Sequence, residues 1–300
     1  MNRRAVSVLV LGAVGVAAFM LAGAGSAKPE SGGAAAKKRC HYVVKRIHGK
    51  KRRVRVCTKP KPAPSWDYVA LGDSLTTGGG RVSPNETYPS AFGRIVKADT
   101  GKTVKVNNLG QDGATSSDLL DGVKNFPSYR QPLRGAEIVT VDIGYNDFGS
   151  DVIESYSRGQ CGGPDNEDCL RNMVARFRTN FDAILDELVT LVDPKKKIIR
   201  VLNQYNNIIG NPELEALLGP TFGQTVGKKY TEALNDATCE AAQAQGVQCA
   251  DVYHAFNGPT GLDNLFTKDL LADGDHPNAK GHQLIAAVLR GLGYAPLRPR

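Results

Sequence analysis

Short apolar runs of strand length alternate along this chain with longer segments in which apolar residues recur at helical spacing. The strand-like runs are predicted at 68–71, 104–108, 137–143, 197–202 and 247–252. Apolar residues three and four positions apart predict one helix over 170–188, which Pro194 stops, and another over 284–292. Regular alternation of strands and helices is typical of a mostly parallel sheet, here five-stranded, with helices on both faces. The expected fold class is therefore α/β.

The first 27 residues follow a different pattern. Arg3 and Arg4 precede an apolar stretch over 5–24, and small residues occupy 25–27. A positive start, an apolar middle and a small-residue end predict a signal peptide over 1–27 and a secreted, extracellular protein. The alternative is an uncleaved membrane anchor, because about 20 apolar residues can span a bilayer.

Charge divides the rest of the chain at residue 64. Residues 28–64 hold 13 lysines and arginines against one acid, Glu30, whereas residues 65–300 hold 23 bases against 29 acids. The net charge of +8 therefore belongs to a basic tail. Such a tail suits an anionic cell wall or membrane surface as partner, and a solvated charge run is the alternative. Its few aromatic residues do not favour a specific nucleic-acid partner.

Six cysteines form three pairs of sequence neighbours, at 40 and 57, 161 and 169, and 239 and 249. Nearest-neighbour disulfides are the simplest of the 15 pairings in an oxidising compartment. Zinc is less favoured, since the chain has neither a C-x-x-C nor an H-E-x-x-H motif. In the tail, β-type runs at 42–44 and 54–56 flank a turn-like 48–50, which predicts a hairpin closed by Cys40 and Cys57. The Pro-rich 59–64 predicts an extended linker to a domain over 65–300.

Four short polar motifs follow the predicted strands or precede the last helix. They are Gly-Asp-Ser-Leu at 72–75, Asn-Leu-Gly-Gln-Asp-Gly-Ala-Thr at 108–115, Gly-Tyr-Asn-Asp at 144–147 and Asp-Gly-Asp-His-Pro at 273–277. A serine hydroxyl such as that of Ser74 is a weak nucleophile unless a base takes its proton, and His276 with Asp273 could supply base and orienting carboxylate. Ligands of open α/β sheets bind beyond the carboxyl ends of the strands, where these motifs are expected.

In this order the motifs resemble those of the SGNH (GDSL) hydrolase family, over residues 66–293. The resemblance implies a three-layer, flavodoxin-like α/β/α fold and ester hydrolysis through an acyl-enzyme. Residue by residue, it makes Ser74 the nucleophile, His276 the general base and Asp273 the carboxylate that orients the imidazole. Asp275 adjoins the same histidine and competes with Asp273 for that role.

The resemblance also implies an oxyanion hole, in which donors face the charge that develops on the ester oxygen. Its three groups map onto the Ser74 backbone N–H, the Gly113 backbone N–H and the Asn146 side-chain amide. Gly110 competes with Gly113, which we prefer because it stands five residues after Asn108 in the family's pattern.

The remaining polar residues are given less specific interpretations. Asp73 and Asp147 are expected to stabilise their turns, and His254 and His282 to be surface or core residues. Residues 203–206 follow the fourth predicted strand and either line the cleft or stay outside it. No G-x-S-x-G elbow occurs, and the glycines at 78–80 lack the phosphate-loop pattern. We therefore expect neither a cofactor nor a metal.

The predicted function is a secreted serine carboxylic ester hydrolase, an esterase or lipase, acting on a small-molecule or lipid ester. Apolar residues within 206–227 indicate an apolar pocket wall and leave its size open. Two alternatives remain. One is a cell-surface polyanion-binding protein with an inactive hydrolase domain, and the other is an acyltransferase that passes the acyl group to an alcohol.

Overall fold

The computed structural model describes residues 39–47, 49–58 and 65–298, which belong to two units, Met1–Pro62 and Ala63–Arg300. The signal peptide expected at 1–27 and the linker expected at 59–64 lie outside the described residues, as does His48.

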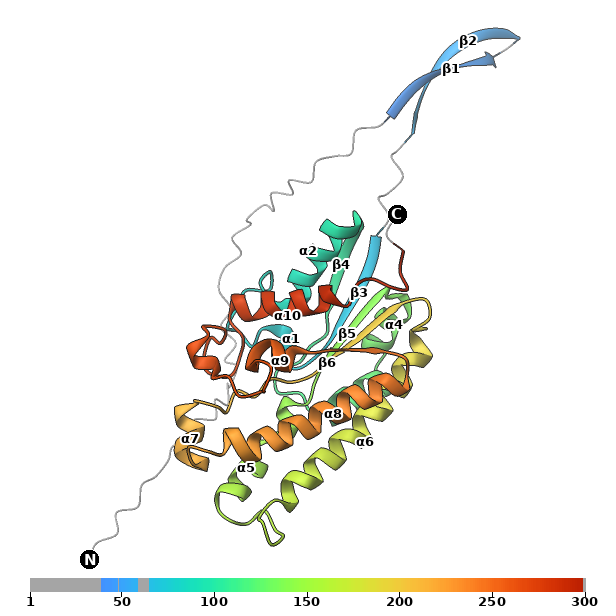
Figure 1. Ribbon diagram of the computed structural model, residues 1–300. Helices are drawn as coiled ribbons and strands as arrows, with labels where there is room; N and C mark the ends of the chain where they lie inside the picture. Colours follow the sequence, from blue (N-terminus) through green and yellow to red (C-terminus); the bar gives the residue numbers. More distant parts are fainter. Residues whose placement is uncertain (1–38, 48, 59–64, 299–300) are drawn as a thin grey trace, which may run out of the picture. The chain divides into compact units, whose positions relative to one another are not determined.

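The first unit contains an antiparallel hairpin of β1 (Arg39–Ile47) and β2 (Lys50–Thr58) (Figure 1). Its register sets Cys40 opposite Cys57, and a disulfide joins the two. The turn is shorter than the sequence pattern predicted, because Lys50 already belongs to β2 and pairs with Ile47.

The second unit is built on a five-stranded sheet in the order β4-β3-β5-β6-β7, with every neighbouring pair parallel. Figure 1 shows β4, β3, β5 and β6 side by side. The strands are β3 (Ser65–Gly72), β4 (Thr103–Asn108), β5 (Ile138–Asp142), β6 (Ile198–Leu202) and β7 (Gln248–Ala250). Each of the five predicted runs contains one of them or lies within it, which confirms the α/β class.

Burial explains why some strands are clearer in the sequence than others. All residues of β5 and β6 are buried, so both strands are predominantly apolar, with Thr140, Asp142 and Arg200 as buried polar exceptions. The last predicted strand, 247–252, was too long at its end. The Asp251 side chain accepts a hydrogen bond from the His254 N–H and caps a helix that begins at Val252.

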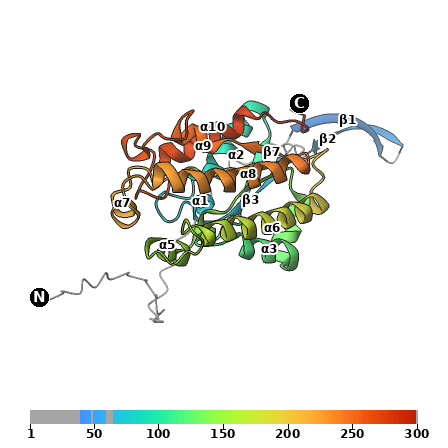
Figure 2. The ribbon, with the colours of Figure 1, turned by 60° about the horizontal axis from the view of Figure 1, so that its bottom comes forward.

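Helices cover both faces of the sheet. Along β3, Tyr68 and Ala70 point into one apolar cluster, whereas Val69 and Leu71 point into the other. Figure 2 shows the two helix layers on opposite sides of the domain. One layer comprises α2 (Tyr88–Thr100), α9 (Val252–Asn257) and α10 (Ala279–Gly291), and the other α3 (Ser116–Asn125), α4 (Pro127–Gly135), α6 (Asp168–Leu191) and α8 (Lys228–Ala244).

Shorter helices lie in the connections. They are α1 (Ser74–Thr77), α5 (Ser150–Ser157) and α7 (Pro212–Leu218), with the helical turns η1 (Tyr145–Phe148), η2 (Gly223–Gly227) and η3 (Leu265–Thr267). Within the described part of the chain, no helix combines the length and apolar character needed to cross a membrane.

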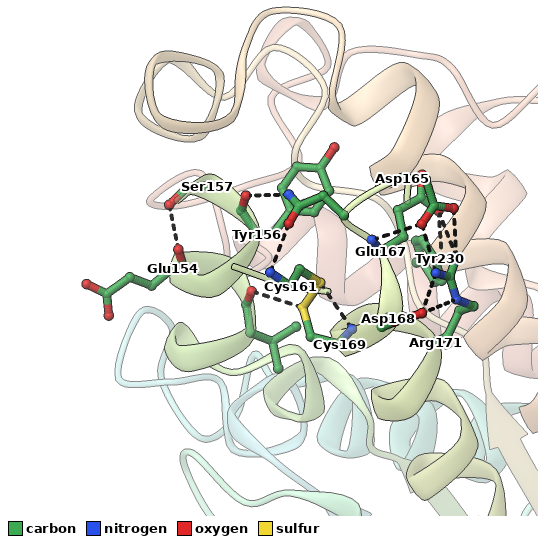
Figure 3. Close-up of a disulfide and its surroundings, with 12 residues drawn as sticks. Glu154, Tyr156, Ser157, Cys161, Asp165, Glu167, Asp168, Cys169, Arg171 and Tyr230 are labelled. Carbon is green, nitrogen blue, oxygen red and sulfur yellow. Dashed lines mark hydrogen bonds and ion pairs between the residues drawn. A yellow bond between two sulfur atoms is a disulfide. The ribbon is translucent and has the colours of Figure 1, made fainter. Parts of the chain in front are cut away.

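This unit contains two further disulfides, and each joins the neighbouring cysteines that the sequence predicted to pair. Cys161 and Cys169 close the loop between α5 and α6 (Figure 3), and Cys239 in α8 is joined to Cys249 in β7. Beside the first bridge, the Arg171 guanidinium pairs with Asp165 at 2.8 Å, which ties the loop to the start of α6.

Candidate active site

The turn after β3 places Ser74 at the carboxyl end of the sheet. Gly72 passes so close to β5 that a Cβ atom there would lie 2.2 Å from the Asp142 carbonyl oxygen, so only glycine fits. Asp73 then caps α1, because its Oδ1 accepts a hydrogen bond of 2.9 Å from the Leu75 N–H. Ser74 is therefore the first residue of α1, immediately beyond the strand end.

The second part of the site is the loop between η3 and α10. An isolated bridge pairs Leu271 with Pro277, and the Ala272 N–H donates to the His276 carbonyl at 2.8 Å. Inside this closed loop, Asp273 Oδ1 accepts from the His276 N–H at 2.7 Å and from the Asp275 N–H at 3.1 Å. These contacts turn the Asp273 carboxylate back toward the imidazole three residues later.

The fold brings these two segments together. Ser74 Oγ lies 3.0 Å from His276 Nε2, and His276 Nδ1 lies 3.0 Å from Asp273 Oδ2. The competing Asp275 stands farther from the ring, with its Oδ2 3.9 Å from Nδ1, and its carboxylate accepts a hydrogen bond from Asn207 at 2.8 Å. Of the two carboxylates, Asp273 is therefore the one positioned to orient the imidazole.

The pKa shifts of Asp273 and Asp275 favour the same carboxylate as the distances do. Partial burial works to raise the pKa of Asp273, but hydrogen bonds from the His276 backbone and ring lower this pKa to about 2. Burial raises the pKa of Asp275, and the neighbouring His276 only partly opposes this. Asp273 is thus the better-stabilised anion beside the imidazole.

Three potential hydrogen-bond donors belong to residues that line the same cavity as Ser74. The Ser74 N–H opens α1 and has no acceptor within that helix. Gly113 has a φ of +77°, a left-handed conformation that favours glycine. The Asn146 amide, in η1 just after β5, donates to the Ala114 carbonyl at 3.0 Å, which joins it to the Gly113 loop. The N–H of the competing Gly110 is already used, since it donates to Asn108 Oδ1 at 3.0 Å.

These groups line one cavity of about 280 Å³. Its lining residues are Ser74, Leu75, Gly79, Asp112, Gly113, Tyr145, Asn146, Asp275 and His276. A second cavity of about 320 Å³ adjoins it, since Tyr145 and Asp275 line both. Five of the second cavity's lining side chains are aliphatic or phenyl groups, namely Phe148, Ile153, Ile208, Leu214 and Leu218.

The other polar residues take the roles expected from sequence only in part. Asp147 accepts a hydrogen bond from the Ser116 N–H at 2.8 Å. It therefore links two separate segments instead of stabilising its own turn, as the sequence had predicted. His282 is a core residue whose Nδ1 accepts from the Tyr88 N–H, and His254 is exposed and pairs with Asp251. Of residues 203–206, Gln204 and Tyr205 line the second cavity, whereas the amides at 203 and 206 hydrogen-bond to neighbouring segments.

Sequence reasoning missed two residues at the site. Gly79 packs so tightly on the imidazole that a Cβ atom there would lie 2.5 Å from His276 Cδ2. Arg81 donates from Nε to Asp273 Oδ2 at 2.6 Å, so it shares the oxygen that faces His276. The run of three glycines before Arg81 was a sequence signal that another segment packs closely against the backbone there. No local pattern indicated that Arg81 pairs with Asp273, which lies 192 residues later in the chain.

Comparisons with known proteins place the chain among related sequences and folds. The sequence matches the GDSL-like lipase/acylhydrolase family over residues 70–284. The spore germination lipase LipC of Bacillus licheniformis is 23% identical over 233 residues, which cover 77% of this chain and 97% of that protein.

Two solved structures are similar across the second unit. The lipase Lip_vut3 from a goat rumen metagenome has a TM-score of 0.63 and 22% identity, covering 78% of this chain and all of that one. The acetylxylan esterase Axe2 of Geobacillus stearothermophilus has a TM-score of 0.55 and 19% identity, covering 80% of this chain and all of that one. The family match spans most of the chain, which therefore belongs to the GDSL-like lipase/acylhydrolase family of ester-hydrolysing enzymes.

Proposed function

We propose that this enzyme hydrolyses carboxylic esters by a serine mechanism with an acyl-enzyme. Ser74 Oγ attacks the ester carbonyl carbon while His276 Nε2 takes the hydroxyl proton. Collapse of the tetrahedral intermediate breaks the bond to the alcohol oxygen, which leaves with the proton from His276. Water then attacks the acyl-enzyme with the same base, which releases the carboxylic acid and restores Ser74. Asp273 holds the imidazole in the tautomer that accepts at Nε2 and stabilises its charged form.

The negative charge that develops on the carbonyl oxygen would be met by the N–H groups of Ser74 and Gly113 and by the Asn146 amide. Preorganised donors of this kind lower the barrier because they require no reorientation during the reaction. The engagement of the Gly110 N–H elsewhere supports Gly113 as the backbone donor from its loop.

The observation that carries this proposal is the pair of 3.0 Å contacts that link Ser74, His276 and Asp273. Its test is hydrolysis of a soluble short-chain aryl ester by purified variants. Ser74→Ala should abolish turnover with an unchanged unfolding transition, and Asn146→Ala should lower kcat by about 100- to 1000-fold. Ser157→Ala is a suitable control, because that hydroxyl donates to the Glu154 carbonyl within α5. Wild-type turnover in Ser74→Ala would refute the mechanism.

The larger neighbouring cavity would receive the acyl chain of the substrate. It shares Tyr145 and Asp275 with the cavity that Ser74 lines, and apolar side chains of α5 and α7 contribute to its walls. We therefore expect esters of medium-length acyl chains to be hydrolysed better than acetyl esters.

The protein would act outside the cell. Three disulfides among the described residues suit an oxidising compartment, and residues 1–27 have the composition of a signal peptide. Expression in a bacterium with secretion machinery should yield esterase activity in the medium from a protein whose N-terminus lies near residue 28. Recovery of all the activity in the cytoplasm, with Met1 retained, would contradict secretion.

A further inference from the structure

The hairpin of β1 and β2 presents two chemically distinct faces. In an antiparallel pair, opposite residues point to the same side and successive residues alternate between sides. The register therefore defines a tyrosine face, made of Tyr42, Val44, Arg46, Lys51, Arg53 and Arg55. The valine face comprises His41, Val43, Lys45, Arg52, Val54 and Val56.

Apolar side chains are most exposed on the tyrosine face. Tyr42 and Val44 are each 61% exposed, whereas the three valines of the other face are half-buried. Arg53 lies over the Tyr42 ring, with its guanidinium carbon 5.3 Å from the ring centroid. An exposed tyrosine and valine are thus surrounded by arginines and a lysine, with no acidic residue in either strand.

From this combination we infer that the tyrosine face binds the surface of an anionic lipid bilayer. Basic residues near such a surface are attracted to its negative potential. Tyrosine is favoured at the boundary between head groups and acyl chains, and arginine can reach phosphates while its stem covers apolar surface. A purely polyanionic partner, such as a wall polymer or nucleic acid, would explain the cations but would leave Tyr42 and Val44 without apolar contact.

The charge of the rest of the chain strengthens this inference. Residues 65–300 carry more acids than bases, so an anionic bilayer would repel that part of the protein. The positive charge of the hairpin would oppose this repulsion and attract the protein to the bilayer. Its attachment would hold the esterase at a lipid surface, where ester substrates of low solubility are concentrated. The binding itself is independent of the proposed serine mechanism.

The test is co-sedimentation of the full chain with vesicles of phosphatidylcholine, with and without phosphatidylglycerol. All variants must share one N-terminus and an intact Cys40–Cys57 bridge, as mass spectrometry can establish. We expect binding that requires phosphatidylglycerol and weakens as salt is added. Equal binding to pure phosphatidylcholine would overturn the inference.

Two matched double variants separate the faces. Arg53→Gln with Arg55→Gln removes two charges from the tyrosine face, and Lys45→Gln with Arg52→Gln removes two from the valine face. At about fivefold for each basic residue near an anionic surface, the first pair should weaken binding by about 25-fold and the second by less than about fivefold. Equal losses of vesicle binding in the two double variants would show that the attraction is not localised to one face of the hairpin. That result would overturn the proposal that the tyrosine face is the docking face.

A third variant, Tyr42→Ser with Val44→Ser, keeps the charge and removes the exposed apolar groups. We expect it to weaken vesicle binding by about tenfold, because burial of these side chains in the head-group region is lost. Unchanged binding in this variant would overturn the lipid assignment, as would tighter binding of the wild type to teichoic acid or DNA than to the anionic vesicles. Hydrolysis of a soluble ester should be the same in all variants, so loss of vesicle binding cannot be confused with failure of the esterase.

Discussion

Asp142 lies at the end of β5, directly beneath the turn that carries Ser74. Its side chain is buried, and Gln204 donates to its Oδ1 at 2.8 Å. Burial raises the pKa of Asp142 to about 7, although the hydrogen bond from Gln204 opposes this. The Asp73 carboxyl next to it has its pKa raised too, by burial first and by the charge of Asp142 second. Two carboxyl groups that favour the protonated form thus support the site.

This raised pKa predicts how stability depends on pH. The folded state binds the Asp142 proton more tightly than the unfolded chain does, so stability falls as pH rises from about 4 to about 7. Asp142→Asn removes this titration and keeps an oxygen for Gln204. The variant should match the wild type at pH 4 and exceed its unfolding free energy at pH 8 by up to about 4 kcal/mol. Denaturant unfolding at both pH values measures this, and equal stabilities at pH 8 would contradict it.

A second prediction at this scale concerns Arg81. Its guanidinium shares Asp273 Oδ2 with the imidazole, but its side chain is 52% exposed. Exposed ion pairs contribute up to about 1 kcal/mol, so Arg81→Gln should lower kcat by no more than about fivefold, with little change in KM. Steady-state kinetics on a soluble ester give both constants. The matched Asp273→Asn variant should lose far more, about 10⁴-fold, because the imidazole then lacks its acceptor. Comparable losses in the two would mean that Arg81 is essential to the geometry.

At the scale of elements, α7 forms one wall of the larger cavity. Leu214 and Leu218 line that cavity, while Leu217, on the same short helix, is 54% exposed and is not among its lining residues. The two sides of α7 therefore offer a contrast between a residue that limits the cavity and a neighbour that does not.

Leu214→Trp should shift the chain-length preference of the enzyme toward shorter esters. If the indole excludes two methylene groups of a medium-length acyl chain, at about 0.8 kcal/mol each, kcat/KM for that ester falls by about 15-fold. Acetyl ester hydrolysis should be unchanged, and Leu217→Trp should leave the whole profile as in the wild type. A series of aryl esters graded by acyl length is the measurement. An unaltered profile in Leu214→Trp would place the acyl chain elsewhere.

At the scale of the whole molecule, the chain divides into two units that our proposals assign to different tasks. The hydrolase elements all belong to Ala63–Arg300, which has its own sheet and cores, and the basic hairpin belongs to Met1–Pro62. Deletion of residues 28–62 should therefore keep soluble-ester turnover within about twofold while vesicle binding is lost. An inactive but folded deletion variant would show that the hairpin contributes to catalysis.

Much of this organisation could be predicted from sequence, because it depends on local patterns. Mostly apolar runs marked β5 and β6, since strands buried on both faces carry mainly apolar side chains on both. Neighbouring cysteines 8 to 17 residues apart were close enough along the chain to pair. The end of β7 was predicted too far along the chain, because Asp251 caps a helix that begins at Val252.

The sequence by itself determined the order of strands and helices, the hairpin and the closeness of Asp273 to His276, for each follows from neighbours along the chain. Only the tertiary structure decided that Ser74 lies against an imidazole 202 residues later, that Arg81 shares its carboxylate, and that the walls of a cavity come from several segments. The physical reason is that such contacts depend on how helices pack on a twisted sheet, where displacements of an ångström or two make or break a hydrogen bond. No local pattern in the chain encodes distances of that kind.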